Sequence, residues 1–341
     1  MTRRDFLATI PPLVCTAGVA NAETNSRQHV PGARVVESVT GSIAVDRLGL
    51  TLMHEHVLVD FIGADHVNPN RYDRDHAFKT VLPHVQQART LGCETLVECT
   101  PAYLGRDPAL LKRLSEASGL QILTNTGYYG AAKDRHLPRH AFTDTAEQLA
   151  TRWIREFEDG IDATSIKPAF MKIGVDEAPL SEVDAKLVRA AAIVYQETRL
   201  PVASHTGSGA AAMQELDILE RARIPLSAFI WVHAQSEQDT TLHISVAKRG
   251  AWVEFDGISP TTVTRHVELV RRMKHEALLG RVLVSHDAGW YRVGEPDGGR
   301  FRPYDTLFTA FVPALRSSGF DAADLRELLV RNPLRALTGE L

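Results

Sequence analysis

The feature that most constrains the fold of this chain is a series of short apolar runs, several of which end in a residue type that binds metal ions. The runs are continuous rather than alternating, which is typical of strands buried on both faces of a parallel sheet. Amphipathic stretches of helix length separate the runs, and this alternation predicts an α/β fold. Eight such strands predict a single (β/α)8 barrel, or TIM barrel.

Each strand of the expected barrel is a run of five to ten residues, and helices fill the intervals. The strands are expected at Leu50–Val59, Thr95–Thr100, Gln121–Thr126, Ala169–Val175, Pro201–His205, Phe229–His233, Trp252–Asp256 and Arg281–Ser285. The helices are expected at Asp107–Ala117, Thr143–Asp159, Ser181–Thr198, Gly209–Arg221, Asp239–Lys248, Thr262–His275, Thr306–Ser317 and Ala322–Val330. A β-hairpin over residues 34–48, with its turn at Gly41-Ser42, precedes the barrel. The barrel domain is expected to span residues 34–341.

Candidate metal ligands occupy the carboxyl ends of several expected strands. His54 and His56 stand two residues apart, so on a strand both side chains point the same way, into the barrel. Two imidazoles on one strand can chelate one cation, although two polar strand residues would give the same pattern. The fifth, sixth and eighth strands end in His205, His233 and Asp287. Since barrel strands bring their carboxyl ends together, these residues predict one metal site at that end.

Lys172 stands inside the fourth expected strand, in the apolar run A-F-M-K-I-G-V. A lysine is usually solvated, but a buried ammonium that faces cations is strongly disfavoured and gives up its proton. The neutral amine can add carbon dioxide, which gives a carbamate (N6-carboxylysine) able to bridge two metal ions. The sequence therefore predicts two divalent cations, and histidine and carboxylate ligands without thiolate suit zinc first, with cobalt or manganese as alternatives.

Taken in order, these residues resemble the phosphotriesterase-like branch of the amidohydrolase superfamily. The resemblance runs from about Val35 to the C-terminus, and includes L-G-R-D-P at 104–108 and N-T-G-Y-Y-G at 125–130. It implies a (β/α)8 barrel with a binuclear metal centre. It assigns His54, His56 and Asp287 to the buried metal and His205 and His233 to the exposed metal. It makes carbamylated Lys172 and a hydroxide the bridges between them.

The implied activity is hydrolysis of an ester, lactone or phosphoester bond in a small-molecule substrate. The exposed metal would polarise a C=O or P=O oxygen, the hydroxide would attack, and Asp287 would act as general base. Tyr129, Asp256 and Trp290 are the residues expected in the substrate pocket, and Asp256 is also expected to orient a group behind the ligands. The chain departs from the family pattern at Ser236, where an acidic residue is common, and at Gly257, where His or Arg is common.

Three alternatives to an ester or lactone hydrolase stay open. The first is a phosphotriesterase proper, or aryldialkylphosphatase, which an aryl phosphotriester substrate would reveal. The second is a non-catalytic barrel of the cell envelope that binds a metal or another ligand, which would hold metal tightly without hydrolysing esters. The third is a mononuclear enzyme such as a deaminase, which would bind one metal per chain and make Lys172 redundant.

The first residues predict export. Arg3 and Arg4, followed by an apolar stretch and the cleavage pattern Ala20-Asn21-Ala22, resemble a twin-arginine signal peptide over residues 1–22. We therefore expect a periplasmic protein without a stable membrane anchor, with a polar, flexible segment at 23–33 before the barrel. A formal net charge of −4 and the lack of a basic patch argue against a nucleic-acid partner. The family resemblance suggests a homodimer.

Overall fold

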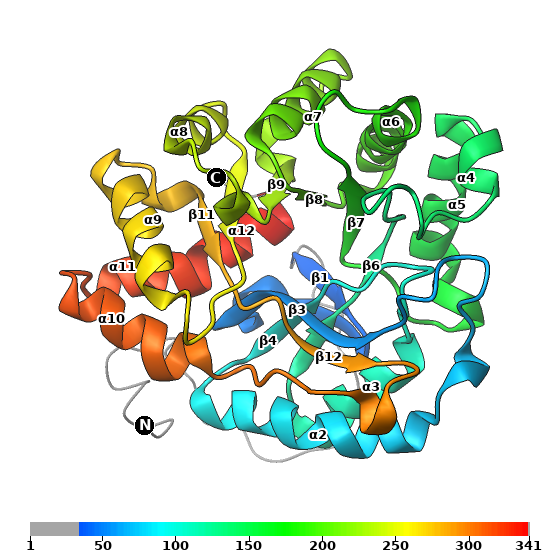
Figure 1. The fold of residues 1–341 in the computed structure, drawn as a ribbon, viewed down its shortest axis with the longest axis horizontal. Coiled ribbons are helices and arrows are strands. Elements are labelled where there is room, and N and C mark those ends of the chain that lie inside the picture. The colour runs from blue at the N-terminus through cyan, green and yellow to red at the C-terminus, as the bar shows by residue number, and fades with distance from the viewer. Residues whose placement is uncertain (1–33, 340–341) are drawn as a thin grey trace.

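A computed structural model describes residues 34–339 of the chain. Its centre is a (β/α)8 barrel, in which a ring of parallel strands is surrounded by helices (Figure 1). The ring contains β3 (Thr51–Val59), β4 (Thr95–Glu98), β5 (Gln121–Leu123), β6 (Asn125–Thr126), β7 (Phe170–Val175), β8 (Val202–Thr206), β9 (Phe229–Val232), β10 (Trp252–Phe255), β11 (Val282–Val284) and β12 (Ala288–Arg292).

Two of the eight barrel strands are interrupted, and these interruptions link two parallel sheets into one ring. One sheet has the order β12-β3-β4-β5, and the other has the order β11-β10-β9-β8-β7-β6. The chain passes from β5 to β6 through Thr124, whose carbonyl accepts a hydrogen bond of 2.8 Å from the backbone N of Ala169. It passes from β11 to β12 through residues 285–287, where the backbone N of Asp287 donates to the carbonyl of His54 at 3.0 Å.

The helices cover the outside of the ring (Figure 1). They are α2 (Arg74–Leu91), α3 (Pro108–Ser118), α4 (His140–Thr143), α5 (Ala146–Asp159), α6 (Glu182–Thr198), α7 (Gly209–Arg221), α8 (Thr240–Lys248), α9 (Val263–His275), α10 (Val312–Ser317), α11 (Ala322–Arg326) and α12 (Asn332–Thr338). Polar side chains that accept backbone N–H bonds fix where several of them begin, as Ser181 does for α6 and Ser208 for α7.

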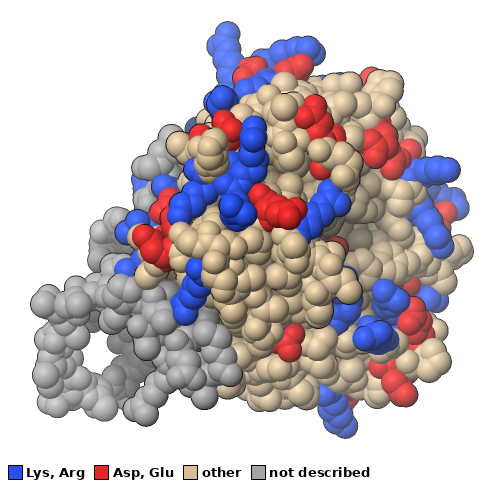
Figure 2. Space-filling view, turned by 60° about the vertical axis from the view of Figure 1, so that its left-hand side comes forward, with Lys and Arg blue, Asp and Glu red and all other residues tan. Residues whose placement is uncertain are grey.

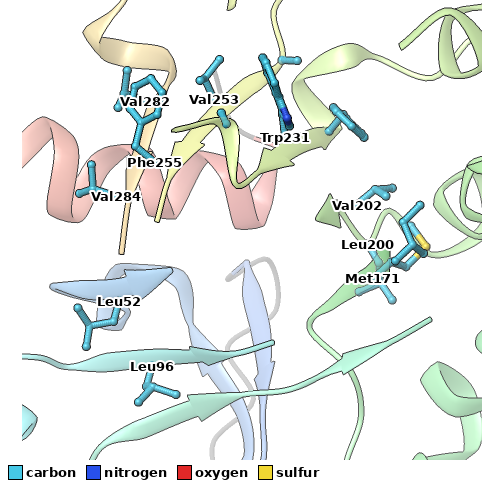
Figure 3. Close-up of a cluster of buried hydrophobic side chains, with 14 of the residues drawn as sticks. Leu52, Leu96, Met171, Leu200, Val202, Trp231, Val253, Phe255, Val282 and Val284 are labelled. Carbon is cyan, nitrogen blue, oxygen red and sulfur yellow. The ribbon is translucent and has the colours of Figure 1, made fainter. Parts of the chain in front are cut away.

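Apolar side chains fill both sides of the barrel wall. The larger cluster lies between the strands and the helices and includes Leu52, Met171, Trp231, Val253 and Val284 (Figure 3). A smaller cluster fills the barrel interior with residues of alternating positions, among them Met53, Val97, Leu123, Phe170, Ile230, Trp252 and Leu283. Because these side chains pack the interior, the barrel is a filled core rather than a pore.

The fold prediction is confirmed, and each predicted strand lies within two residues of an observed one. The hairpin is also present, as β1 (Val35–Ser38) and β2 (Gly41–Ala44), but its predicted turn at Gly41-Ser42 is wrong. The turn falls two residues earlier, at 39–40, because Ser38 Oγ donates to the carbonyl of Gly41 at 2.7 Å and Gly41 begins the return strand.

Three elements differ from the sequence prediction for identifiable reasons. The helix α2 was not predicted, and Pro83 lies within it. The helix α5 begins after Thr145 rather than Thr143, because Thr145 and Gln148 form a reciprocal capping box. The eighth strand, predicted to end at Ser285, resumes as β12, which pairs with β3 in parallel register.

The predicted export and the absence of a membrane anchor concern the surface and the N-terminus of the protein. Within residues 34–339, the helices are too short or too polar to span a membrane. Basic and acidic side chains are interspersed on the face of the molecule seen in Figure 2. The predicted signal peptide at 1–22 and the polar segment at 23–33 lie outside the described residues.

Candidate metal centre

The six predicted metal ligands line one cavity of about 80 Å³ at the carboxyl ends of the barrel strands. His54 and His56 come from β3, Lys172 from β7 and His205 from β8. His233 directly follows β9, and Asp287 lies between β11 and β12. The remaining lining residues are mostly apolar or aromatic: Val59, Phe61, Cys99, Pro101, Leu104, Tyr129 and Trp290. Strands far apart in the sequence thus place every predicted ligand around one small space.

A β-bulge in β3 directs the two histidines inward. The register between β3 and β4 shifts between Leu52 and Glu55. Because of this shift, two successive side chains face the inside of the barrel: Met53 belongs to the interior cluster, and His54 lines the cavity. His56 follows on the same face, as the spacing of two residues predicted. The Nε2 atoms of His54 and His56 are 3.2 Å apart.

Two other ligands reach the cavity through backbone conformations that strand alternation does not provide. Val232 belongs to the interior cluster, so His233 would point outward if β9 continued. Its φ of 65° turns the chain and brings the side chain back to the cavity. Asp287 has a φ of 51° for the same purpose. Positive φ values are uncommon in residues other than glycine, and they cluster at functional sites.

The ligand atoms form two groups. His54, His56 and Asp287 have donor atoms that all lie within 4.8 Å of one another, and Asp287 Oδ1 is 3.2 Å from His56 Nε2. His205 and His233 form the second group, with ring centroids 4.3 Å apart. The His54 and His233 rings connect the groups, with centroids 5.0 Å apart. His54 is common to two sets of donor atoms that lie within 4.8 Å of one another, since it also groups with His233 and Asp256.

Lys172 lies between the interior cluster and the cavity. Phe170 belongs to the interior cluster and Met171 to the outer one, so alternation directs Lys172 inward. Its side chain is 2% exposed, and its Nζ has no hydrogen-bond partner within residues 34–339. A buried amine without a partner is costly unless another group completes its environment. This orphaned nitrogen is what a carbamate bridge between two cations would use.

Asp256, predicted in the substrate pocket, lies behind the histidines instead and does not line the cavity. It is fully buried, and its Oδ1 accepts hydrogen bonds from His233 Nδ1 at 2.5 Å and Gln235 Nε2 at 2.7 Å. Its Oδ2 is 3.4 Å from His54 Nδ1. It directly follows β10, two residues beyond Glu254, and points inward to the layer beneath the ligands.

Carboxylates dominate the electrostatics of this layer. Burial lowers the pKa of His54, but Asp256 and Glu254 outweigh it and raise that pKa from 6.5 to about 10. Burial lowers the pKa of His56 to about 4, since Asp287 compensates only in part. Burial raises the pKa of the Asp287 carboxyl, but the hydrogen bond to His56 and the charge of His54 lower it more, so it stays below its usual range.

A second carboxylate orients His56 from the neighbouring strand. His56 Nδ1 lies 2.8 Å from Thr100 Oγ1, and that hydroxyl donates to Glu98 Oε1 at 2.5 Å. Because the hydroxyl proton is used on Glu98, Nδ1–H of His56 must donate to the hydroxyl, and Nε2 faces the cavity with its lone pair. The sequence analysis missed this pair, although E-C-T at a strand end was a visible signal.

Aromatic side chains form the cavity wall. Tyr129 and Trp290 both line it, as predicted, and Trp290 packs edge-on against His56 with centroids 5.4 Å apart. The Tyr129 hydroxyl lies 3.1 Å from His205 Nε2. Phe61 was not predicted; its ring centroid lies 5.4 Å from that of Trp290, and its side chain is 39% exposed at the rim of the cavity. These rings narrow the entrance and shield the ligands from water.

Comparisons with known proteins agree with this geometry. The phosphotriesterase family model matches residues 34–337. A phosphotriesterase homology protein of Escherichia coli is 28% identical over 85% of this chain and 98% of its own length. An aryldialkylphosphatase of Saccharolobus solfataricus is 23% identical over 86% of this chain and 96% of its own. The structure of a phosphotriesterase-like lactonase mutant of Deinococcus radiodurans superposes with a TM-score of 0.79 at 26% identity, and covers 89% of this chain and 99% of that one.

Proposed function

Because the chain belongs to the phosphotriesterase family, a family of binuclear metal hydrolases, we propose that it binds two divalent cations and hydrolyses a small organic ester or lactone. The observation that carries this proposal is the Lys172 amine. It is buried, has no hydrogen-bond partner within residues 34–339, and lines the same cavity as four histidines and Asp287. A barrel that binds no metal would not need an amine kept at such a cost.

We assign the ligands in two groups. His54, His56 and Asp287 would hold one cation, and His205 and His233 would hold the other, with carbamylated Lys172 between them. The donor set of imidazole and carboxylate groups without thiolate suits zinc, while cobalt and manganese are accepted by the same set. The cations, when bound, would supply a Lewis acid for the carbonyl oxygen and an activated water.

The residues around the cations have separable tasks. The low pKa of Asp287 keeps it ionised, so it can take up the proton of the attacking water as general base. Asp256 accepts the Nδ1–H of His233, and Thr100 accepts that of His56, so both rings present Nε2 to the cavity. Trp290, Tyr129 and Phe61 exclude bulk water from the reacting group.

The size of the cavity favours a small acyl group over a bulky phosphotriester. Its volume is about 80 Å³, whereas pockets that enclose whole drug-sized ligands measure roughly 300–1,000 Å³. Only the reacting end of a substrate fits beside the ligands, and the remainder must lie at the rim. Relatives named as a lactonase and as an aryldialkylphosphatase support both bond types, and the narrow floor leads us to place the lactone first.

A substrate panel with metal analysis tests the proposal. Purified protein should contain two metal ions per chain and hydrolyse small lactones or esters faster than an aryl phosphotriester. The opposite preference would support a phosphotriesterase proper. One ion per chain would favour a mononuclear enzyme, and tight binding of two ions without any hydrolysis would favour the non-catalytic barrel.

We also propose that the protein is exported to the periplasm and forms a homodimer, as the sequence analysis anticipated. The twin-arginine pattern supports export, and the family resemblance supports the dimer. Fractionation of cells before and after substitution of Arg3 and Arg4 by Lys tests export, and light scattering of the purified protein tests the dimer.

A further inference from the structure

Glu55 stands between two predicted ligands in β3, but its side chain points out of the barrel, away from the cavity. It is fully buried, and its carboxylate accepts four hydrogen bonds from residues 285–288. Oε1 accepts from Ser285 Oγ at 2.8 Å, from the backbone N of His286 at 3.1 Å and from His286 Nδ1 at 2.6 Å. Oε2 accepts from the backbone N of Ala288 at 2.9 Å.

These donors are the residues on either side of Asp287. The turn from 285 to 288 interrupts the eighth strand, and Asp287 sits in it with a φ of 51°. Such a conformation is unfavourable for a residue with a side chain, so the surroundings must hold it. The backbone of Asp287 itself bonds to the carbonyl of His54. The hydrogen bonds to Glu55 fix the other residues of the turn, Ser285, His286 and Ala288.

His286 extends this network to the helices. The backbone N of Leu307 donates to His286 Nε2 at 2.8 Å, which leaves the ring proton on Nδ1, where it donates to Glu55. Ser285 Oγ accepts a hydrogen bond of 2.9 Å from the backbone N of His54 while it donates to Glu55. The turn is therefore hydrogen-bonded to β3 through both the backbone of His54 and the side chain of Glu55.

We propose that Glu55 is a positioning residue that holds the Asp287 carboxylate against His54 and His56 from outside the barrel wall. This inference rests on the proposed function, because it gives Asp287 its purpose. Glu55 touches neither substrate nor cations. It acts by fixing the turn whose geometry sets the ligand group of the buried metal.

Glu55→Gln tests the proposal with almost no change in shape. An amide nitrogen replaces one acceptor oxygen, so at least one N–H of the turn then faces another donor. We expect the affinity for one of the two metal ions to fall by roughly 10–100-fold, the usual effect of losing an outer partner of a ligand. The kcat should fall with little change in KM, because Asp287 acts on the reacting water. Metal content at graded chelator concentrations and steady-state kinetics measure the two effects.

Asp107→Asn serves as the matched control. Asp107 is a buried carboxylate that accepts hydrogen bonds from Leu110 N, Arg74 Nε and Tyr72 Oη, but these partners hold no predicted ligand. Its substitution should lower stability without changing metal content. If E55Q does not fold, Ser285→Ala removes one donor to Glu55 together with the acceptor for the backbone N of His54, and it should weaken binding of the same metal ion.

The outcomes separate the two claims. Wild-type and E55Q proteins that both bind two ions with equal affinity and equal kcat would overturn the positioning role and leave the proposed function intact. A wild-type protein that binds no divalent metal would overturn both. Loss of metal in D107N as large as in E55Q would also overturn the proposal, because the effect would then be one of general stability.

Discussion

Replacement of Lys172 by Met should change stability in opposite directions with and without metal. The Lys172 Nζ is buried and has no hydrogen-bond partner within the part of the chain that the structure describes. An unsatisfied buried polar group costs roughly 1–3 kcal/mol, and Met fills the same volume without it. The metal-free K172M protein should therefore unfold with a free energy higher by about this amount.

The metal-loaded protein should behave in the reverse way. A ligand at a hundredfold excess over its Kd stabilises the folded state by about 2.7 kcal/mol. Wild-type protein gains this for each of two zinc ions, about 5.4 kcal/mol together, whereas K172M, which cannot form the carbamate bridge, should gain little. Stability measured by urea unfolding should thus rank K172M first in chelator and wild type first in zinc.

The assay needs elemental analysis and one control. Lys248→Met, at an exposed position on α8, should change stability by less than about 0.5 kcal/mol under both conditions. A K172M protein that is less stable than wild type in chelator would refute the reasoning about the orphaned amine. A K172M protein that retains two zinc ions per chain would refute the bridging role.

Three further predictions concern the layers around the ligands. Burial raises the pKa of Glu215 from 4.5 to about 8, so the folded state holds a proton that the unfolded state releases, and stability should fall as pH rises from 4.5 to 8. Glu215→Gln should remove this slope in urea unfolding, and an unchanged slope would contradict the assignment. Asp256→Asn should lower the pKa of His54 and weaken metal binding by roughly 10–100-fold in chelator competition; equal affinity would rule out its orienting role. Trp290→Ala should widen the cavity and raise the activity toward an aryl phosphotriester relative to a small lactone, and an unaltered ratio would argue against a wall at this position.

The barrel and four of the six predicted ligands could be predicted from the sequence because they depend on simple periodicities. Strand alternation alone directs Lys172 and His205 inward, and spacing by two pairs His54 with His56. Alternation does not direct His233, which needs a positive φ that no sequence pattern announces. Asp256 was assigned to the pocket by the family resemblance, but its distance from the cavity depends on where β10 ends.

The groups that orient the ligands were less predictable, since they depend on contacts between distant segments. Glu98 reaches His56 only through Thr100, and Glu55 meets residues 285–288 more than two hundred positions away. Each contact depends on the register of neighbouring strands, which the hydrophobic pattern fixes only within a residue or two. The helix α2 was missed because Pro83 lies inside it, although its N-cap Asp73 is a standard start signal.

Three buried glutamates, Glu55, Glu98 and Glu215, hold the predicted ligands in place through residues next to them or bonded to them. Glu215 of α7 accepts hydrogen bonds from Ser204 and Thr206, the two neighbours of His205. In the same way Glu55 holds the neighbours of Asp287, and Glu98 holds Thr100, which contacts His56. None of these anchors is Phe61, which lines the cavity and is exposed at its rim. Substitution of this rim residue should therefore change the substrate preference of the proposed hydrolase without loss of metal, because the carboxylates that hold the ligands stay in place.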